Sequence, residues 1–226
     1  VERVVSAGVT LAKQAAGDRA LVALDIGPIG QMLEPTGALE FEAAVEIFSE
    51  MVRAGAAAGA DLVVIETMTD LQEARAALLA AKENCALPVL ATMTFEENRR
   101  TFVGCGIPSM ALTLTGLGAD AIGINCSLGP RQMGPLVEEL RRWTHLPLVL
   151  KPNAGLPDPA GGGYDITPEE FARALAELGE GGVQFLGGCC GTDPEYIALL
   201  RRELDGKRRT RYEAAVPAAV CSGTRV

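Results

Sequence analysis

The sequence predicts an α/β fold, a (β/α)8 barrel that lacks its first two βα units in this chain. Six apolar runs alternate with helical patterns, each run is continuously apolar as in parallel strands covered on both faces, and polar or sulfur residues stand where the runs end. Such alternation suits either a closed barrel or an open doubly wound sheet. The polar run ends favour the barrel, because its strand ends converge on one mouth.

Each expected element has its own signal. The first helix stops at Gly17, and no strand precedes it, which is why two βα units are expected to be absent. The last helix opens with an N-cap Asp193, a first-turn Pro194 and an acid, and Thr167 opens another helix as an N-cap. The expected helices are 1–16, 41–52, 70–86, 108–117, 130–143, 167 onward and 193–204, and the expected strands are 21–25, 61–66, 88–95, 121–126, 147–153 and from 183.

Two segments differ in composition. Residues 1–204 carry the alternating pattern and are expected to form one domain. Residues 205–226 are basic and then rich in Ala and Pro, which is typical of a linker toward a further domain.

Composition excludes several classes of partner. The net charge is −9, the chain has one histidine, and no basic patch stands out, so we expect no nucleic acid partner. No apolar run reaches the roughly 18 residues of a membrane span, and no secretory signal is present. Six cysteines without a regular framework indicate reactive or metal-bound thiols in a reducing compartment, and we expect the cytoplasm.

The vicinal pair Cys189 and Cys190 stands on a glycine-rich turn after the last apolar run. Adjacent cysteines rarely pair, because a disulfide needs Cα atoms about 4.4–6.8 Å apart and neighbours lie about 3.8 Å apart. Cys126 at the end of strand 121–126 adds a third thiol at the same mouth. Three thiolates with an open fourth position indicate catalytic zinc, and Asn153 is an oxygen that can fill that position while substrate is away.

Such a site favours alkyl transfer to a thiol. Three thiolates leave the metal complex anionic and poorly suited to making hydroxide, whereas a coordinated substrate thiol is deprotonated and stays nucleophilic. A redox role for the vicinal pair is disfavoured, because it lacks the two-residue spacer of redox motifs. Isolated cysteines are more often buried core residues, which is the interpretation for Cys85 and Cys105, and Cys221 is expected to be exposed and without a role.

The motifs at the strand ends resemble the homocysteine S-methyltransferase family. They are Gly-Ile-Asn-Cys-Ser (123–127), Pro-Asn-Ala-Gly (152–155) and Gly-Gly-Cys-Cys-Gly-Thr-x-Pro-Glu (187–195), with Asp-Ile-Gly-Pro (25–28), Ile-Glu-Thr (65–67) and Met-Thr-Phe (93–95) in support. The resemblance covers about residues 1–204 and implies a (β/α)8 barrel. It also implies zinc held by the three cysteines, and by Asn153 when homocysteine is absent.

The resemblance implies substrate residues as well. Glu66 is expected to hold the ammonium group of homocysteine, with the alternative that this strand-end acid caps the next helix. Asp25 is assigned to substrate with the alternative that it braces the turn before Gly27. Asn125 is assigned likewise, with the alternative that it orients its neighbour or bonds the backbone.

Within the family, the motifs look most like those of the N-terminal module of cobalamin-dependent methionine synthases. That likeness implies methylcobalamin on another module as methyl donor, with a folate-binding module following the 205–226 linker. The alternatives are betaine, S-methylmethionine or a folate-reductase partner as the source of the methyl group. A further alternative is an inactive zinc-binding fragment.

Overall fold

The computed structural model describes residues 1–157, 161, 163–207 and 215–226. Strands and helices alternate through this part of the chain, close to the ranges expected from the sequence. The helices are α1 (Glu2–Ala16), α2 (Phe41–Ala57), α3 (Leu71–Asn84), α4 (Ile107–Gly116), α5 (Pro130–Leu140), α6 (Pro168–Glu180) and α7 (Pro194–Leu204). The strands are β1 (Ala23–Ile26), β2 (Leu62–Met68), β3 (Val89–Met93), β4 (Ala121–Asn125), β5 (Leu148–Lys151) and β6 (Phe185–Leu186).

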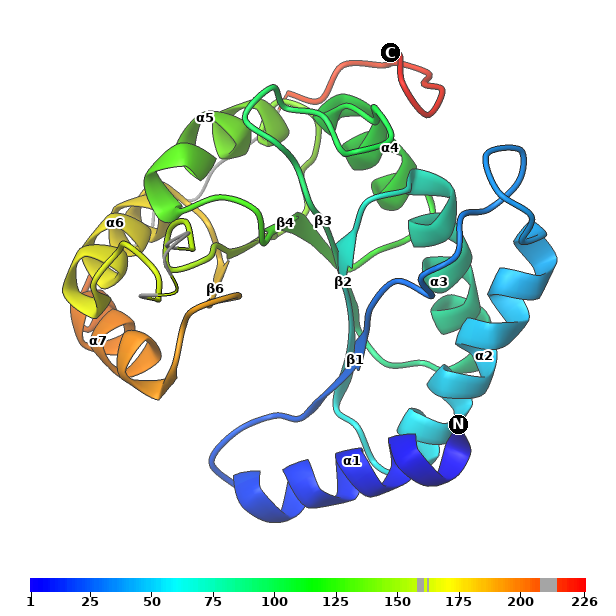
Figure 1. The fold of residues 1–226 in the computed structure, drawn as a ribbon, viewed down its shortest axis with the longest axis horizontal. Helices are drawn as coiled ribbons and strands as arrows, with labels where there is room; N and C mark the ends of the chain where they lie inside the picture. The colour runs from blue at the N-terminus through cyan, green and yellow to red at the C-terminus, as the bar shows by residue number, and fades with distance from the viewer. Residues whose placement is uncertain (158–160, 162, 208–214) are drawn as a thin grey trace.

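The six strands form one parallel sheet in the order β1-β2-β3-β4-β5-β6. Figure 1 shows the sheet curved, with the helices along its outer side and α1 and α7 at the two ends of an incomplete ring. The fold is therefore an α/β half-barrel, which is consistent with part of the predicted (β/α)8 barrel. In register, Asp25 of β1 pairs with Val64 of β2, and Asn125 of β4 pairs with Lys151 of β5.

The main core fills the space between the sheet and the helices. Alternate strand residues such as Ile26, Ile65 and Ile122 point into it and are fully buried, together with Phe48 of α2 and Phe171 of α6. This convex face holds most of the buried apolar surface and supplies the main driving force for folding.

The concave face carries a second, smaller apolar layer. Its buried members are Leu90, Ala121 and Val149, with Leu62 and Val64 packed against them. Gly123 lies in the same region, and a Cβ there would overlap the backbone of Val149. Two positions after Val64, Leu90 and Val149, on the same face, lie the polar residues Glu66, Thr92 and Lys151 of the candidate site.

Helix caps match the sequence signals. The side chains of Asp70, Thr167 and Asp193 accept hydrogen bonds from the first-turn amides of α3, α6 and α7, at 2.9, 3.3 and 2.8 Å. The Asp193 cap fixes the direction in which the chain leaves the vicinal cysteines.

The expectation that Cys221 is exposed is wrong. The side chain is half-buried, with its sulfur 3.4 Å from Thr113 Oγ1 and 3.8 Å from the Ser109 carbonyl oxygen of α4. Residues 215–226 lie along the outside of the molecule there, whereas 208–214 of the predicted linker lie outside the described residues.

Within the described residues, no helix combines the length and apolar character needed to cross a lipid bilayer.

Asp61 ties α1 to the sheet. Both of its carboxylate oxygens lie 2.9 Å from Lys13 Nζ, and Oδ2 accepts a hydrogen bond from the Val22 amide at 2.7 Å. The Val22 amide and then Lys13 lower the pKa of Asp61. The ionised carboxylate therefore stabilises the fold above the unfolded-state pKa of about 3.9, and this contribution is lost as the pH falls through the lower folded-state pKa.

We expect Asp61→Asn to lower the thermal unfolding midpoint at pH 7, because the uncharged amide cannot replace the ion pair with Lys13. The difference from the unsubstituted protein should shrink below pH of about 4. Calorimetry across this range measures it, with the exposed Asp18→Asn as control. A difference independent of pH would contradict the assigned electrostatic role.

Candidate functional site

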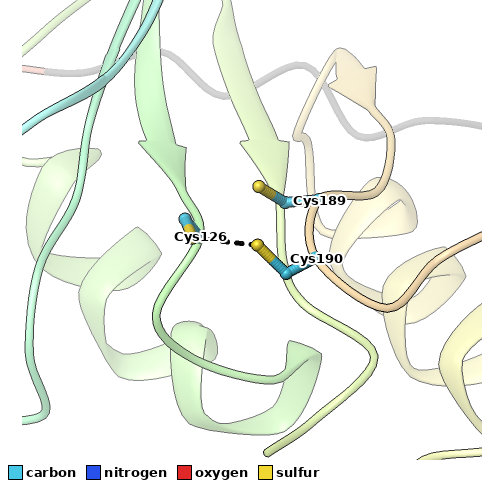
Figure 2. A group of neighbouring side chains, drawn as sticks. All are labelled: Cys126, Cys189 and Cys190. Atoms are coloured by element: carbon cyan, nitrogen blue, oxygen red, sulfur yellow. Dashed lines mark hydrogen bonds between the residues drawn. The ribbon is translucent and has the colours of Figure 1, made fainter. Parts of the chain in front are cut away.

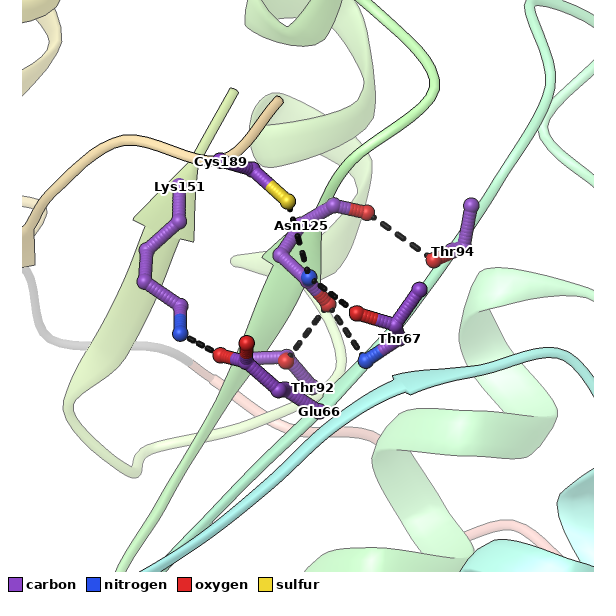
Figure 3. Close-up of polar contacts among 7 residues, drawn as sticks. All are labelled: Glu66, Thr67, Thr92, Thr94, Asn125, Lys151 and Cys189. Atoms are coloured by element: carbon purple, nitrogen blue, oxygen red, sulfur yellow. Dashed lines mark hydrogen bonds and ion pairs between the residues drawn. The ribbon is translucent and has the colours of Figure 1, made fainter. Parts of the chain in front are cut away.

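A layer of polar side chains crosses the concave face above the small apolar layer. Glu66, Thr92 and Lys151 each follow a concave-face residue by two positions, and Asn125 lies in register with Lys151. Asp25 of β1 is exposed and is in register with Val64, two residues before Glu66. The carboxyl ends of the strands therefore bring one polar row together at the mouth of the half-barrel, as the sequence predicted (Figure 3).

Cys126 directly follows β4 in an unusual backbone conformation. Cys126 and Ser127 have φ of 63° and 64°, the left-handed region that non-glycine residues rarely adopt. The Cys126 amide donates to the Lys151 carbonyl oxygen at 3.0 Å, and its carbonyl accepts from Leu128 at 2.8 Å. This turn ends the strand abruptly and keeps the sulfur at the mouth.

The vicinal cysteines lie on the loop between β6 and α7. The Cys189 amide donates to the Pro152 carbonyl oxygen at 2.9 Å, and the Cys190 carbonyl oxygen accepts from the Ala154 amide at 2.9 Å. Asn153 Oδ1 accepts a hydrogen bond from the Cys190 amide at 3.1 Å. Residues 152–154, which follow β5, therefore fix the loop by hydrogen bonds to its main chain.

Glycine is required on both sides of the pair. A Cβ at Gly188 would overlap the Thr192 side chain, and one at Gly191, which has φ of 79°, would overlap the Tyr164 ring. The Tyr164 ring therefore lies against the backbone of the turn that carries the thiols. Tyr164 lies in the glycine-rich loop before α6 and was not predicted from the sequence.

The three sulfurs gather at one point (Figure 2). Cys126 Sγ lies 3.7 Å from Cys190 Sγ, and the three ligand atoms all lie within 4.8 Å of one another. Cys126 and Cys189 are half-buried, and Cys190 is exposed. The structure therefore brings together the three cysteines that the sequence placed at the same mouth.

Contacts between the thiols shift the pKa values of Cys189 and Cys126 in opposite directions. A hydrogen bond with Cys126 lowers the pKa of Cys189 to about 5, and the Cys190 amide and the Asn125 side chain act in the same direction. The same contact with Cys189, followed by burial, raises the pKa of Cys126.

Asn125 is fully buried and links the sulfur cluster to the sheet. Its Oδ1 accepts from the Thr67 amide at 2.8 Å and from Thr92 Oγ1 at 2.7 Å, and its Nδ2 donates to Thr67 Oγ1 at 2.8 Å and to Cys189 Sγ at 3.8 Å. Thr67 itself has φ of 62°. These contacts fit the alternative that Asn125 orients its neighbours, and a direct contact with substrate stays a prediction.

Glu66 has a cationic partner within the chain. Lys151 Nζ forms an ion pair with Glu66 Oε2, and the two side chains are 23% and 21% exposed (Figure 3). Burial lowers the pKa of Lys151, while the charges of Asp25 and Cys189 oppose that shift. Partial burial of the carboxyl group raises the pKa of Asp25, although the residue as a whole is exposed, and the charge of Lys151 opposes this shift. Lys151 was not identified from the sequence, although a lysine closing an apolar strand beside Asn125 is a recognisable signal.

Comparison with known proteins identifies what this arrangement resembles. The model of the homocysteine S-methyltransferase family matches residues 1–204. Methionine synthases from Mycobacterium leprae and Mycobacterium tuberculosis are 33% and 32% identical over 208 and 203 residues. Each alignment covers 84% of this chain but only 17% of the relative's length.

Solved structures share the fold. The homocysteine methyltransferase MmuM from Escherichia coli, in its apo form, has a TM-score of 0.73 at 24% identity, covering 89% of this chain and 73% of that chain. Its metallated form has a TM-score of 0.69 at 25% identity, covering 89% and 70%.

Removal of the Asn125 amide should destabilise the fold. We expect Asn125→Ala to lower the free energy of unfolding by about 1–3 kcal/mol, because it leaves the Thr67 amide without its acceptor in the protein interior. Urea denaturation at pH 7 measures this. Gln14→Ala, at an exposed position of α1, is the control and should change the free energy by about 0.5 kcal/mol or less. Equal effects of the two substitutions would contradict the role given to Asn125.

Proposed function

Because this chain belongs to the homocysteine S-methyltransferase family, we propose that it is the homocysteine-binding module of a cobalamin-dependent methionine synthase. In this role it uses zinc to transfer a methyl group to the homocysteine thiol and so forms methionine. The observation that carries the proposal is the meeting of Cys126, Cys189 and Cys190 at the mouth of the half-barrel. The sequence motifs alone do not show that sulfurs from two distant segments lie close together in space.

The three cysteines suit zinc. Tetrahedral zinc with Zn–S distances of about 2.3 Å spaces its sulfurs about 3.8 Å apart. The Cys126–Cys190 separation of 3.7 Å fits this spacing. The Cys189 sulfur lies within 4.8 Å of the other two, so it would have to move by about 1 Å or less to reach the same spacing. Zinc would supply deprotonation of the substrate thiol and hold it as a nucleophile.

Asn153 is the proposed fourth ligand in the absence of homocysteine. Its Oδ1 accepts one hydrogen bond, from the Cys190 amide, and a carbonyl oxygen has a second lone pair. The Asn153 side chain is buried beside the cluster, and the Leu128 carbonyl oxygen fixes its main chain at 3.0 Å from the amide. The Asn153 oxygen is therefore held close to the cysteines and keeps a lone pair that is available to a metal.

The chain's other polar residues would bind and orient the substrate. We assign the substrate ammonium group to Glu66, whose carboxylate faces the concave side, with Asp25 as a second carboxylate at the mouth. Asn125 completes the proposed substrate site and holds Cys189 through its amide.

Methylcobalamin carried by another module is the proposed methyl donor. The support is the similarity to mycobacterial methionine synthases, which exceeds the identity to MmuM, and the small share of those relatives that this chain spans. We propose that residues 205–226 lead to a folate-binding module, and that two further βα units complete the barrel between β6 and β1 in the intact protein. The six free cysteines are consistent with a reducing compartment, which we propose to be the cytoplasm. Betaine and S-methylmethionine are the alternative donors.

Zinc analysis of cysteine variants tests the metal centre. We expect about one zinc per chain, and loss of at least about tenfold in zinc affinity when Cys126, Cys189 or Cys190 is changed to Ser, because each change removes a thiolate ligand. Cys85→Ser is the matched control and should keep its zinc. Full zinc retention by Cys126→Ser would contradict the assignment.

Titration with homocysteine tests the function itself. At pH 7 a free thiol is largely protonated, so binding as a thiolate should release about one proton per zinc. Proton release measured in two buffers of different ionisation enthalpy gives this number. Zinc binding without proton release, and without a spectral change in cobalt-substituted protein, would instead support the inactive zinc-binding alternative.

A further inference from the structure

We propose that the Tyr164 hydroxyl donates a hydrogen bond to the Cys190 thiolate and so directs the methyl group to the substrate sulfur and away from this ligand sulfur. The inference rests on the function proposed above. It makes Tyr164 a positioning residue, which acts through the cysteine that it contacts.

The proposed reaction needs a means of choosing among sulfurs. It brings the homocysteine thiolate to three cysteine thiolates, and each thiolate is a nucleophile that can accept a methyl group. Cys126 and Cys189 are half-buried, whereas Cys190 is exposed and open to the same methyl donor (Figure 2). Methylation of Cys190 would remove a negative metal ligand, so this sulfur has to be the weaker nucleophile.

The Tyr164 ring is held against the turn that carries the vicinal cysteines. A Cβ at Gly191 would overlap this ring, so the ring packs directly on the residue that follows the pair. Tyr164 is bridged to Pro157, and the next pair of contacts is the Ile166 amide with the Ala154 carbonyl oxygen at 3.0 Å. The main chain on both sides of the β5–α6 loop therefore fixes where the ring lies.

The Tyr164 hydroxyl faces the sulfur cluster. It forms a hydrogen bond with the Cys190 side chain, and the charged groups that act on it are Cys190, Cys126 and Cys189. Burial, followed by the charge of Cys190 and this hydrogen bond, raises the pKa of Tyr164. The phenol therefore keeps its proton near neutral pH, which makes the hydroxyl the donor and the sulfur the acceptor.

Asn125 makes the corresponding contact on the other cysteine of the pair. Its Nδ2 donates to Cys189 Sγ at 3.8 Å, from the side of the sheet. Cys189 and Cys190 thus each receive a hydrogen bond from an uncharged side chain. Such a bond stabilises the thiolate, and the nucleophilicity of a thiolate falls as its basicity falls. Both ligand sulfurs are therefore made less reactive while their negative charge is kept for the metal.

Two other roles for Tyr164 predict different results. If the ring only shielded Cys190, Tyr164→Phe would keep the ring and leave the reactivity of Cys190 unchanged. If Tyr164 only stiffened the loop, loss of another hydroxyl contact from the same loop would have the same effect. The Tyr196 hydroxyl supplies that comparison, because it donates to the Ile166 carbonyl oxygen at 2.8 Å.

Methylation of the zinc-loaded protein by methyl iodide tests the proposal. The attacking sulfur forms a C–S bond as the C–I bond breaks and iodide leaves, and peptide mass spectrometry gives the rate at each cysteine. We expect Tyr164→Phe to methylate Cys190 about three- to tenfold faster, because the thiolate has lost a charge-assisted hydrogen bond. With equimolar homocysteine, the ratio of methylated Cys190 to methionine should rise by the same factor.

Cobalt-substituted protein gives a readout that does not depend on a reaction. Loss of the hydrogen bond raises the energy of the sulfur lone pairs, so the sulfur-to-cobalt charge-transfer band of Tyr164→Phe should move to longer wavelength. Rates are compared at saturating zinc, and circular dichroism checks that each variant is folded.

Tyr196→Phe is the matched control and should change neither the rate at Cys190 nor the band. An unchanged rate and band in Tyr164→Phe, or an equal increase in Tyr196→Phe, would overturn the role of the Tyr164 hydroxyl while leaving the proposed function intact. Failure of the unsubstituted protein to bind zinc at the three cysteines would overturn both.

Discussion

The end of β5 is the constraint on which the site depends, because it separates and holds the two cysteine segments. Cys126 donates its amide to the Lys151 carbonyl oxygen on one side, and Cys189 donates to the Pro152 carbonyl oxygen on the other. Asn153 adds a side-chain acceptor for the Cys190 amide. Three consecutive residues thus set the distance between sulfurs that lie 64 positions apart in the sequence, and the parallel order of β4, β5 and β6 makes this spacing a property of the sheet itself.

Three strained backbone residues lie at the carboxyl ends of the strands that surround this site. Thr67, Cys126 and Ser127 adopt positive φ, which costs of order 1 kcal/mol or more for each non-glycine residue. The buried Asn125 amide offsets this cost at Thr67 through two hydrogen bonds, one to its amide and one to its hydroxyl. These hydrogen bonds fix the side chains beside the sulfur cluster, which is the preorganisation that the proposed metal and substrate site would need.

Much of the fold and of the sulfur cluster could be predicted from the sequence, because both depend on local signals. Apolar runs, caps such as Asp193 and cysteines at strand ends are read one segment at a time. The Glu66–Lys151 pair could not be predicted, since it depends on the register of strands that are not neighbours. Cys221 was misjudged for a related reason: tail composition indicates a linker, but not the surface of α4 against which the tail packs.

The most direct measurement is X-ray absorption at the zinc edge, before and after addition of homocysteine. The account predicts three sulfur ligands and one oxygen or nitrogen ligand in the free protein, and four sulfur ligands when homocysteine is bound. Cys126→Ser should remove one sulfur from the free protein. Four sulfurs before substrate is added, or an unchanged sulfur count in Cys126→Ser, would contradict a shared metal centre with one position open to the substrate thiol.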